Sequence, residues 1–136
     1  MNGYRFKMLW IGDGPDSNFY KEEIRKNKLQ ENIELLGRKQ NPYPYFKISD
    51  CVILTSDYEG YPVVFLESFI LNKPIITTKV SDYEQVEGKY GYVTDKSIDD
   101  IYEKMKLFIE KGFDIKQEFD ANQYNSEIIK KLERIF

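Results

Sequence analysis

The 136-residue chain is predicted to form a Rossmann-like, open parallel α/β sheet with helices on both faces. Apolar runs of strand length alternate with segments of helical period along most of the chain. These runs are apolar throughout rather than at every second residue, which is typical of strands covered on both faces. Ligands of such sheets bind beyond the carboxyl ends of the strands. The loops that follow the strands are therefore the candidate binding segments.

Five apolar runs are predicted to be strands because each is short and bounded by turn residues. The first ends at Gly12-Asp-Gly-Pro15, the second is stopped by Gly37, and the third is apolar from Cys51 onwards. The fourth run ends just before Lys79, and the fifth begins at Gly91. In chain order the expected strands are 6–11, 33–36, 51–55, 74–78 and 91–94.

Helix signals fill the segments between these strands. Asp16 or Ser17 can cap the first helix, Pro62 suits the first turn of another, and Ser97 can cap the helix after the last strand. We expect helices at about 16–28, 42–48, 62–71 and 97–111, a helical turn at 82–87, and a final amphipathic helix starting at Tyr124 or Ser126. One Rossmann-like domain should cover 1–112, followed by a polar segment and amphipathic helix over 113–136.

The composition excludes several classes of function. A net charge of -3 provides no basic surface for nucleic acid. No apolar run approaches the ~20 residues of a membrane span, and no signal peptide is recognisable. The chain has no histidine, which removes histidine-based triads and most zinc sites. Cys51 lies in an apolar run and is expected to be an inert, buried thiol in a cytoplasmic protein.

Two carboxylates, Glu59 and Glu67, bracket the predicted start of a helix. Gly60 and Pro62 lie between them, so Glu59 falls in a loop and Glu67 in the second turn of the helix. The free amides of Val63 and Val64 then form an anion site, most obviously for phosphate. A carboxylate can accept hydrogen bonds from two sugar hydroxyls at once. Phosphate and hydroxyl groups together indicate a nucleotide sugar.

Two further loops at the carboxyl ends of strands are candidates. Gly12 and Gly14 could let a ligand approach the backbone, although a simple turn explains them equally well. They match neither the dinucleotide fingerprint nor a P-loop. Gly37 and Arg38 could meet a nucleotide base, or could belong to a solvated loop. Lys79 is a weaker candidate near the sugar or phosphate.

These blocks, in this order, resemble a known family. They are Trp10-Ile-Gly-Asp-Gly-Pro15, Ile33-Glu-Leu-Leu-Gly37, Ser49-Asp-Cys-Val-Ile-Leu-Thr-Ser56, Glu59-Gly-Tyr-Pro-Val-Val-Phe-Leu-Glu67 and Asn72-Lys-Pro-Ile-Ile-Thr-Thr78, followed by Glu84 and Gly91. Residues 9–91 resemble the donor-binding C-terminal domain of retaining GT-B glycosyltransferases of family 4, the glycosyl transferases group 1. The subgroup that it resembles is common among bacterial polysaccharide enzymes.

The resemblance implies a role for each candidate. Glu67 would hold the ribose hydroxyls, Glu59 would contact the transferred sugar, and the amides of Val63 and Val64 would bind the diphosphate. Gly37 and Arg38 would border the base, while Gly12 and Gly14 would shape the floor of the cleft. The donor would be a UDP- or GDP-sugar, and no divalent metal or other cofactor would be needed. The product would belong to a bacterial surface glycan such as capsule or lipopolysaccharide.

The chain also departs from the family pattern. The first strand–helix unit of the domain and the whole N-terminal acceptor domain are missing, and Ser81-Asp82 replaces a pair of glycines. We therefore expect a fragment that does not catalyse transfer alone. Association with the inner face of the membrane would come only through the full-length enzyme.

Two other hypotheses remain open from the sequence. One is a non-catalytic nucleotide-sugar-binding or regulatory module. The other is a flavodoxin-like or response-regulator-like domain that uses Asp13 and Asp57, in which the two glutamates would have no role. The sequence names neither the base, the sugar nor the acceptor.

Overall fold

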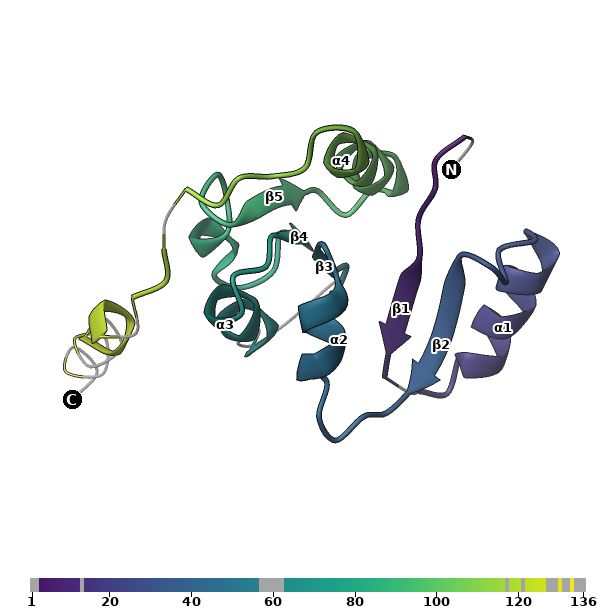
Figure 1. Ribbon diagram of the computed structural model, residues 1–136, viewed down its shortest axis with the longest axis horizontal. Helices are drawn as coiled ribbons and strands as arrows, with labels where there is room; N and C mark the ends of the chain where they lie inside the picture. The colour runs from purple at the N-terminus through teal and green to yellow at the C-terminus, as the bar shows by residue number, and fades with distance from the viewer. Residues whose placement is uncertain are drawn as a thin grey trace. The chain divides into compact units, whose positions relative to one another are not determined.

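The computed structural model describes residues 3–12, 14–56, 63–116, 118–120, 122–126, 130 and 133 (Figure 1). Strands and helices alternate in the predicted order, which confirms the α/β class. The chain divides into two compact units, Met1–Ile48 and Ser49–Phe136, and each is described here by itself.

The first unit contains β1 (Met8–Ile11), α1 (Ser17–Lys26), β2 (Ile33–Gly37) and α2 (Tyr43–Ile48). β1 and β2 are parallel neighbours joined by α1, which lies alongside them (Figure 1). The pairing shifts register between Trp10 and Ile11, so that Ile11 lies opposite Gly37. Lys7 and Glu34 form an exposed ion pair at 3.4 Å.

The aromatic side chains of this first unit remain partly in solvent. Trp10 of β1 packs against Tyr20 of α1 with ring centroids 4.7 Å apart, and Phe19 contacts Tyr20 at 5.7 Å. The exposed fractions are 40% for Trp10 and 60% for Phe19. None of the described residues of this unit is fully buried. Its strands therefore have the apolar sequence of buried strands without the burial.

The second unit contains β3 (Val52–Leu54), α3 (Val63–Ile70), β4 (Ile75–Thr78), the 3₁₀ helix η1 (Tyr83–Gln85), β5 (Gly91–Thr94) and α4 (Ile98–Lys111). Its three strands are parallel and lie in the order β3-β4-β5. Figure 1 shows α3 and α4 on opposite sides of the strands. Every residue of the central strand β4 is buried.

The core of the second unit is built around the face of α3 that carries Phe65 and Phe69. These two side chains pack with Ile75, Val86 and Tyr90 in one buried cluster. The rings of Phe69 and Tyr90 stack with centroids 4.0 Å apart. Full burial of such side chains stabilises the fold by about 1.5–3 kcal/mol each.

The described strands pair in parallel throughout, as the predicted fold class requires. β1 pairs with β2 within the first unit, and β4 lies between β3 and β5 within the second. Strand identity depends on local sequence, whereas pairing depends on which strand edges meet. The apolar runs therefore predicted the five strands, whereas the partner of each strand is known from the structure alone.

The segment that follows α4 packs on the core of the second unit. Ile115 and Phe119 lie against the buried cluster, and the Lys116 amide donates to the Lys89 carbonyl at 3.0 Å. The predicted boundary between 1–112 and 113–136 stays a prediction.

The last helix begins earlier than predicted. Residues 122–126 are helical, and the carboxylate of Asp120 accepts from the amides of Asn122 and Gln123 at 2.9 and 3.0 Å. Asp120 is thus the cap, because its side chain satisfies amides that the first turn leaves free. The start predicted at Tyr124 or Ser126 was therefore late by at least two residues. The apolar positions predicted for its later turns lie outside the described residues.

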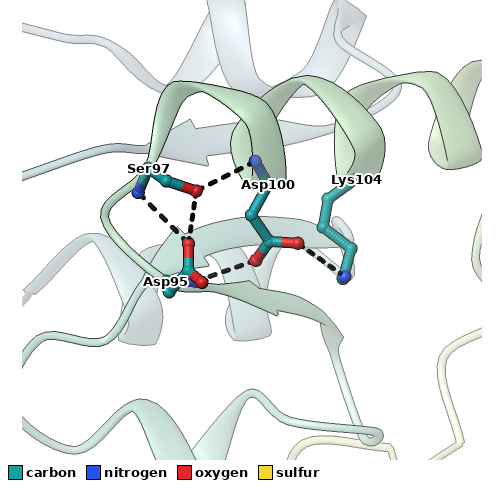
Figure 2. A network of polar contacts seen from close by, with 4 residues as sticks. All are labelled: Asp95, Ser97, Asp100 and Lys104. Atoms are coloured by element: carbon teal, nitrogen blue, oxygen red, sulfur yellow. Dashed lines mark hydrogen bonds and ion pairs between the residues drawn. The ribbon is translucent and has the colours of Figure 1, made fainter.

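A polar network holds the loop between β5 and α4 (Figure 2). The Ser97 hydroxyl accepts from the Asp100 amide at 3.1 Å and donates to the Asp95 carboxylate at 2.7 Å. The Asp100 carboxylate in turn accepts from the Asp95 amide and from Lys104, at 2.9 and 3.2 Å. Hydrogen bonds from Ser97 keep the pKa of Asp95 below its usual value. The hydrogen bond from the Asp100 amide to the Ser97 hydroxyl confirms Ser97 as the predicted N-cap of α4.

Substitution Ser97→Ala should lower the free energy of unfolding by about 1 kcal/mol at pH 7, because the first turn of α4 loses its cap. The folded state depresses the pKa of Asp95, so the part of this stability that comes from Asp95 is present above its unfolded pKa. It is lost as the pH falls through the folded pKa. Urea unfolding of both proteins at pH 7 and in acid measures the difference. A difference that stays constant or grows in acid would contradict the role of Asp95.

Candidate functional site

The carboxyl ends of β3, β4 and β5 form one edge of the sheet in the second unit. Thr78 at the end of β4 lies in register with Thr94 at the end of β5. The Thr78 hydroxyl donates to the carbonyl of Ser56, just after β3, at 2.6 Å. Parallel strands place their following residues on the same edge, so this edge gathers Ser56 and the loops at 79–84 and 94–97.

Helix α3 begins at this edge. It follows β3 in chain order and leads back to β4, so its N-terminus must lie where β3 ends. Val63 is the first helical residue and is 55% exposed. Amides in the first turn of an α-helix have no acceptor within the helix, and they carry the positive end of its dipole. The N-terminus of α3 can therefore receive an anion.

Glu67 lies one turn further along α3. The face of α3 towards the core carries Phe65, Ser68 and Phe69, all buried. Val63 and Glu67 are four residues apart and share another stripe of the helix. Glu67 is half-buried, and helical side chains lean towards the N-terminus, so that its side chain starts out towards the first turn. The neighbouring Ser68 hydroxyl donates a hydrogen bond to the Val64 carbonyl at 2.8 Å.

Three predicted site residues, Glu59, Gly60 and Pro62, lie outside the described residues, as do Asp13 and Asp57 of the alternative hypothesis. The helix predicted from position 62 is described from Val63. The structure therefore places Val63, Val64 and Glu67 together on α3.

The glycine loops of the first unit come together at the carboxyl ends of β1 and β2. The Gly12 amide donates to the Gly37 carbonyl at 2.9 Å. Both glycines have positive φ, +131° and +70°, a backbone conformation that other residues rarely adopt. Gly14 and Arg38 follow in exposed positions, and a Cβ added at Gly12, Gly14 or Gly37 would meet no atom within 4 Å. The structure thus brings Gly12 and Gly37 into contact and leaves the surface beside them open.

Sequence reasoning assigned no individual role to Thr78, Thr94 or Asp95. The Thr94 hydroxyl is buried and finds no hydrogen-bond partner within the described part of the chain. Lys79 lies close enough to Asp95 to contribute to the lowered pKa of that carboxyl, although Ser97 has the larger effect. The only signal in the sequence was the position of these residues at the ends of predicted strands.

Cys51 is partly exposed rather than fully buried, and its thiol has the raised pKa that an inert cysteine requires. Burial raises the pKa of its thiol to about 12, against a smaller opposing effect of the Ile76 backbone amide. The thiol is therefore protonated at neutral pH and is a poor nucleophile.

Other kinds of site find little support in the described ranges. No cluster of three or more metal-ligating side chains occurs there, and none of their helices is long and apolar enough to cross a bilayer. A hollow lined by Phe69, Asn72 and Phe119 lies beside Pro74, before β4 begins. It is therefore at the end of the sheet opposite to the candidate site.

Comparisons with known proteins identify the fold. The structure of Anabaena Alr3699/HepE in complex with UDP superposes with a TM-score of 0.73 over 95% of this chain and 41% of that chain, at 19% identity. The lipopolysaccharide outer core galactosyltransferase WaaB in its apo form gives the same TM-score over 92% of this chain and 41% of that chain, also at 19% identity. The fold is therefore Rossmann-like and of the GT-B type.

Sequence comparisons identify the family. An uncharacterized glycosyltransferase of Methanocaldococcus jannaschii, MJ1059, is 40% identical over 72 residues, 53% of this chain and 18% of that protein. The amylovoran biosynthesis glycosyltransferase AmsD of Erwinia amylovora is 29% identical over 99 residues, 71% of this chain and 28% of that protein. The chain thus spans less than a third of either relative. The family model for glycosyl transferases group 1 matches residues 2–126, so the chain belongs to the group 1 glycosyltransferases.

Proposed function

We propose that this chain is the donor-binding part of a retaining glycosyltransferase and binds a nucleoside-diphosphate sugar. The observation that carries the proposal is the start of α3, where free amides open at the carboxyl edge of the sheet with Glu67 one turn behind them. Phosphate and hydroxyl groups are the two chemistries that this arrangement can bind together.

Each candidate has a role in the proposed complex. The first amides of α3 bind the diphosphate, and the Glu67 carboxylate accepts hydrogen bonds from the ribose hydroxyls. Glu59 contacts the transferred sugar, and the loops at Gly12 and Gly37 border the base and the floor of the cleft. The dipole of α3 stabilises the negative charge that develops on the leaving diphosphate, so the reaction needs no divalent metal.

The wider process proposed is the assembly of a bacterial surface polysaccharide in the cytoplasm. AmsD, a relative at 29% identity, is named for amylovoran biosynthesis, and the HepE structure was solved with UDP. We take UDP as the first nucleotide to test, with GDP as the alternative. Because the chain covers only part of its relatives, transfer to an acceptor requires the rest of the enzyme, and the chain alone should be inactive.

Titration calorimetry tests the proposal. The chain should bind UDP or GDP with a measurable heat, and the affinity should be the same in EDTA and in magnesium, because the helix supplies the charge that a metal would otherwise bring. Inorganic phosphate should compete weakly, since it occupies the amides alone. Binding of neither diphosphate, with the fold shown intact by circular dichroism, would contradict the proposal.

A further inference from the structure

Two residues of opposite charge are neighbours at the carboxyl edge of the sheet in the second unit. Thr78, the last residue of β4, lies in register with Thr94, the last residue of β5. Lys79 follows the first of them and Asp95 the second, and both charged side chains are exposed. Hydrogen bonds from Ser97 are the main cause of the lowered pKa of Asp95, and the charge of Lys79 adds to it. The two charges therefore interact in the free protein.

The carboxylate of Asp95 is held in place by its own loop (Figure 2). One of its oxygens accepts from the Ser97 hydroxyl at 2.7 Å and from the Ser97 amide at 3.1 Å. The Asp95 amide donates to the Asp100 carboxylate at 2.9 Å, and that carboxylate also contacts Lys104 at 3.2 Å. Asp95 is therefore a fixed negative charge at this edge.

Lys79 has a fixed backbone and a side chain that can change its partner. Its neighbours in the chain, Thr78 and Val80, are 1% and 5% exposed, and the Val80 amide donates to the Thr78 carbonyl at 2.8 Å. The exposed ammonium group is carried on a flexible stem of four carbons. An anion bound nearby can therefore attract it without any movement of the sheet.

The candidate anion site needs such a cation. Besides Lys79 and Lys96, the loops at 79–84 and 94–97 carry Asp82, Glu84 and Asp95. The acidic side chains repel a diphosphate at the start of α3, and the helix dipole provides only about half a positive charge. Lys79 is well placed to add to it, because the Thr78 hydroxyl before it donates to the carbonyl of Ser56, just after β3, at 2.6 Å. Lysine is a common binder of phosphate groups.

We propose that Lys79 is a cation of the diphosphate site and that Asp95 competes with the diphosphate for it. In the free protein Lys79 faces Asp95, and in the complex its ammonium group turns to the diphosphate. Asp95 thereby lowers the affinity for the nucleotide, which speeds its release. The competition rests on the proposed function, since it concerns the same site.

A double-mutant cycle in the affinity for UDP, measured by calorimetry, tests the competition. Lys79→Gln should weaken binding about three- to tenfold, because a charged partner of the diphosphate is lost. Asp95→Asn should strengthen binding about two- to fivefold, the range of an exposed ion pair, because Lys79 no longer has to leave a partner. Asparagine keeps the oxygen that accepts from Ser97, so the loop should stay in place.

The effect of Asp95→Asn in the Lys79→Gln background decides the matter. Only direct repulsion between Asp95 and the diphosphate remains there, so the gain in affinity should shrink to less than about half of its size in the unsubstituted chain. An equal gain would mean that the two residues act independently, and a larger one that Lys79 merely screens Asp95. Either result would overturn the proposal.

Asp99→Asn and Lys111→Gln are the matched controls. Asp99 is exposed in the first turn of α4 and Lys111 in its last turn, and the two substitutions change the net charge by the same amounts as the test pair. Each should leave the affinity for UDP within about twofold. Effects as large as those at Lys79 and Asp95 would assign the changes to net charge and overturn the proposal.

Inorganic pyrophosphate separates this proposal from the proposed function. It has the charge of the diphosphate without the nucleoside, so its binding, followed by the NMR shifts of the α3 amides, should show the same coupling between Lys79→Gln and Asp95→Asn. Coupling with pyrophosphate in a chain that binds neither UDP nor GDP would support the charge pair and contradict the nucleotide-sugar function. Binding of UDP without coupling would do the reverse, and binding of none of the three would overturn both.

Discussion

Replacing Gly91 with alanine is expected to destabilise the second unit by about 3 kcal/mol or more, at the upper end of the cost of overpacking. Gly91 opens β5 and lies opposite Ile75 of the buried strand β4. A Cβ at this position would overlap the backbone carbonyl of Ile75, and a backbone atom in a central strand cannot rotate away. Such a loss is a large part of the ~5–15 kcal/mol that stabilises a typical domain. Urea unfolding followed by circular dichroism measures it.

Gly14 and Gly88 are matched controls for this substitution. A Cβ at Gly14 meets nothing within 4 Å, and the residue does not have positive φ, so Gly14→Ala should be almost neutral. Gly88 has equally open surroundings but a φ of +73°, so Gly88→Ala isolates the cost of backbone conformation. Equal unfolding midpoints for Gly91→Ala and Gly14→Ala would show that the two strands do not approach as closely as described.

Substitution Glu67→Gln should weaken UDP binding by at least about tenfold, because a hydrogen bond to a charged group contributes ~1.5–3 kcal/mol. The change keeps the size and shape of the side chain but removes the charge that favours two ribose hydroxyls. Calorimetric titration with UDP measures the effect, and thermal unfolding of the same sample separates lost binding from lost structure.

Glu103→Gln is the control for Glu67→Gln. Glu103 is an exposed glutamate on α4, and its substitution changes the net charge of the chain by the same amount. Its affinity for UDP should match the unsubstituted chain. Equal affinities for Glu67→Gln and Glu103→Gln would remove Glu67 from the proposed site. Loss of ribose contact alone should leave weak binding of inorganic phosphate unchanged in both.

The features that local sequence determines were predictable. The five strands lie within about a residue or two of their predicted positions, and Ser97 caps α4 as its type and position indicated. Asp120 was missed as a cap because the residues around it show no apolar periodicity that would mark a helix. Local patterns report such features because they depend on neighbours within one turn.

The features that depend on distant parts of the chain were not predictable. The partner of each strand depends on which strand edges meet. The Thr94 hydroxyl, which has no partner within the described part of the chain, depends on its burial in the folded second unit. At the candidate site, the helix start and the position of Glu67 followed from the spacing of Pro62 and Glu67. The contact between Gly12 and Gly37 required the pairing of β1 with β2, which two separate turn signals do not specify.

The rate at which the Cys51 thiol is labelled can report how often the region around β3 opens. The residue directly precedes that strand, and burial raises the pKa of its thiol to about 12. A thiol reagent at neutral pH should therefore react slowly with the native protein, and faster with molecules in which this part of the sheet has transiently come apart. With one cysteine in the chain, the labelling rate reports the frequency of that event without any engineered probe.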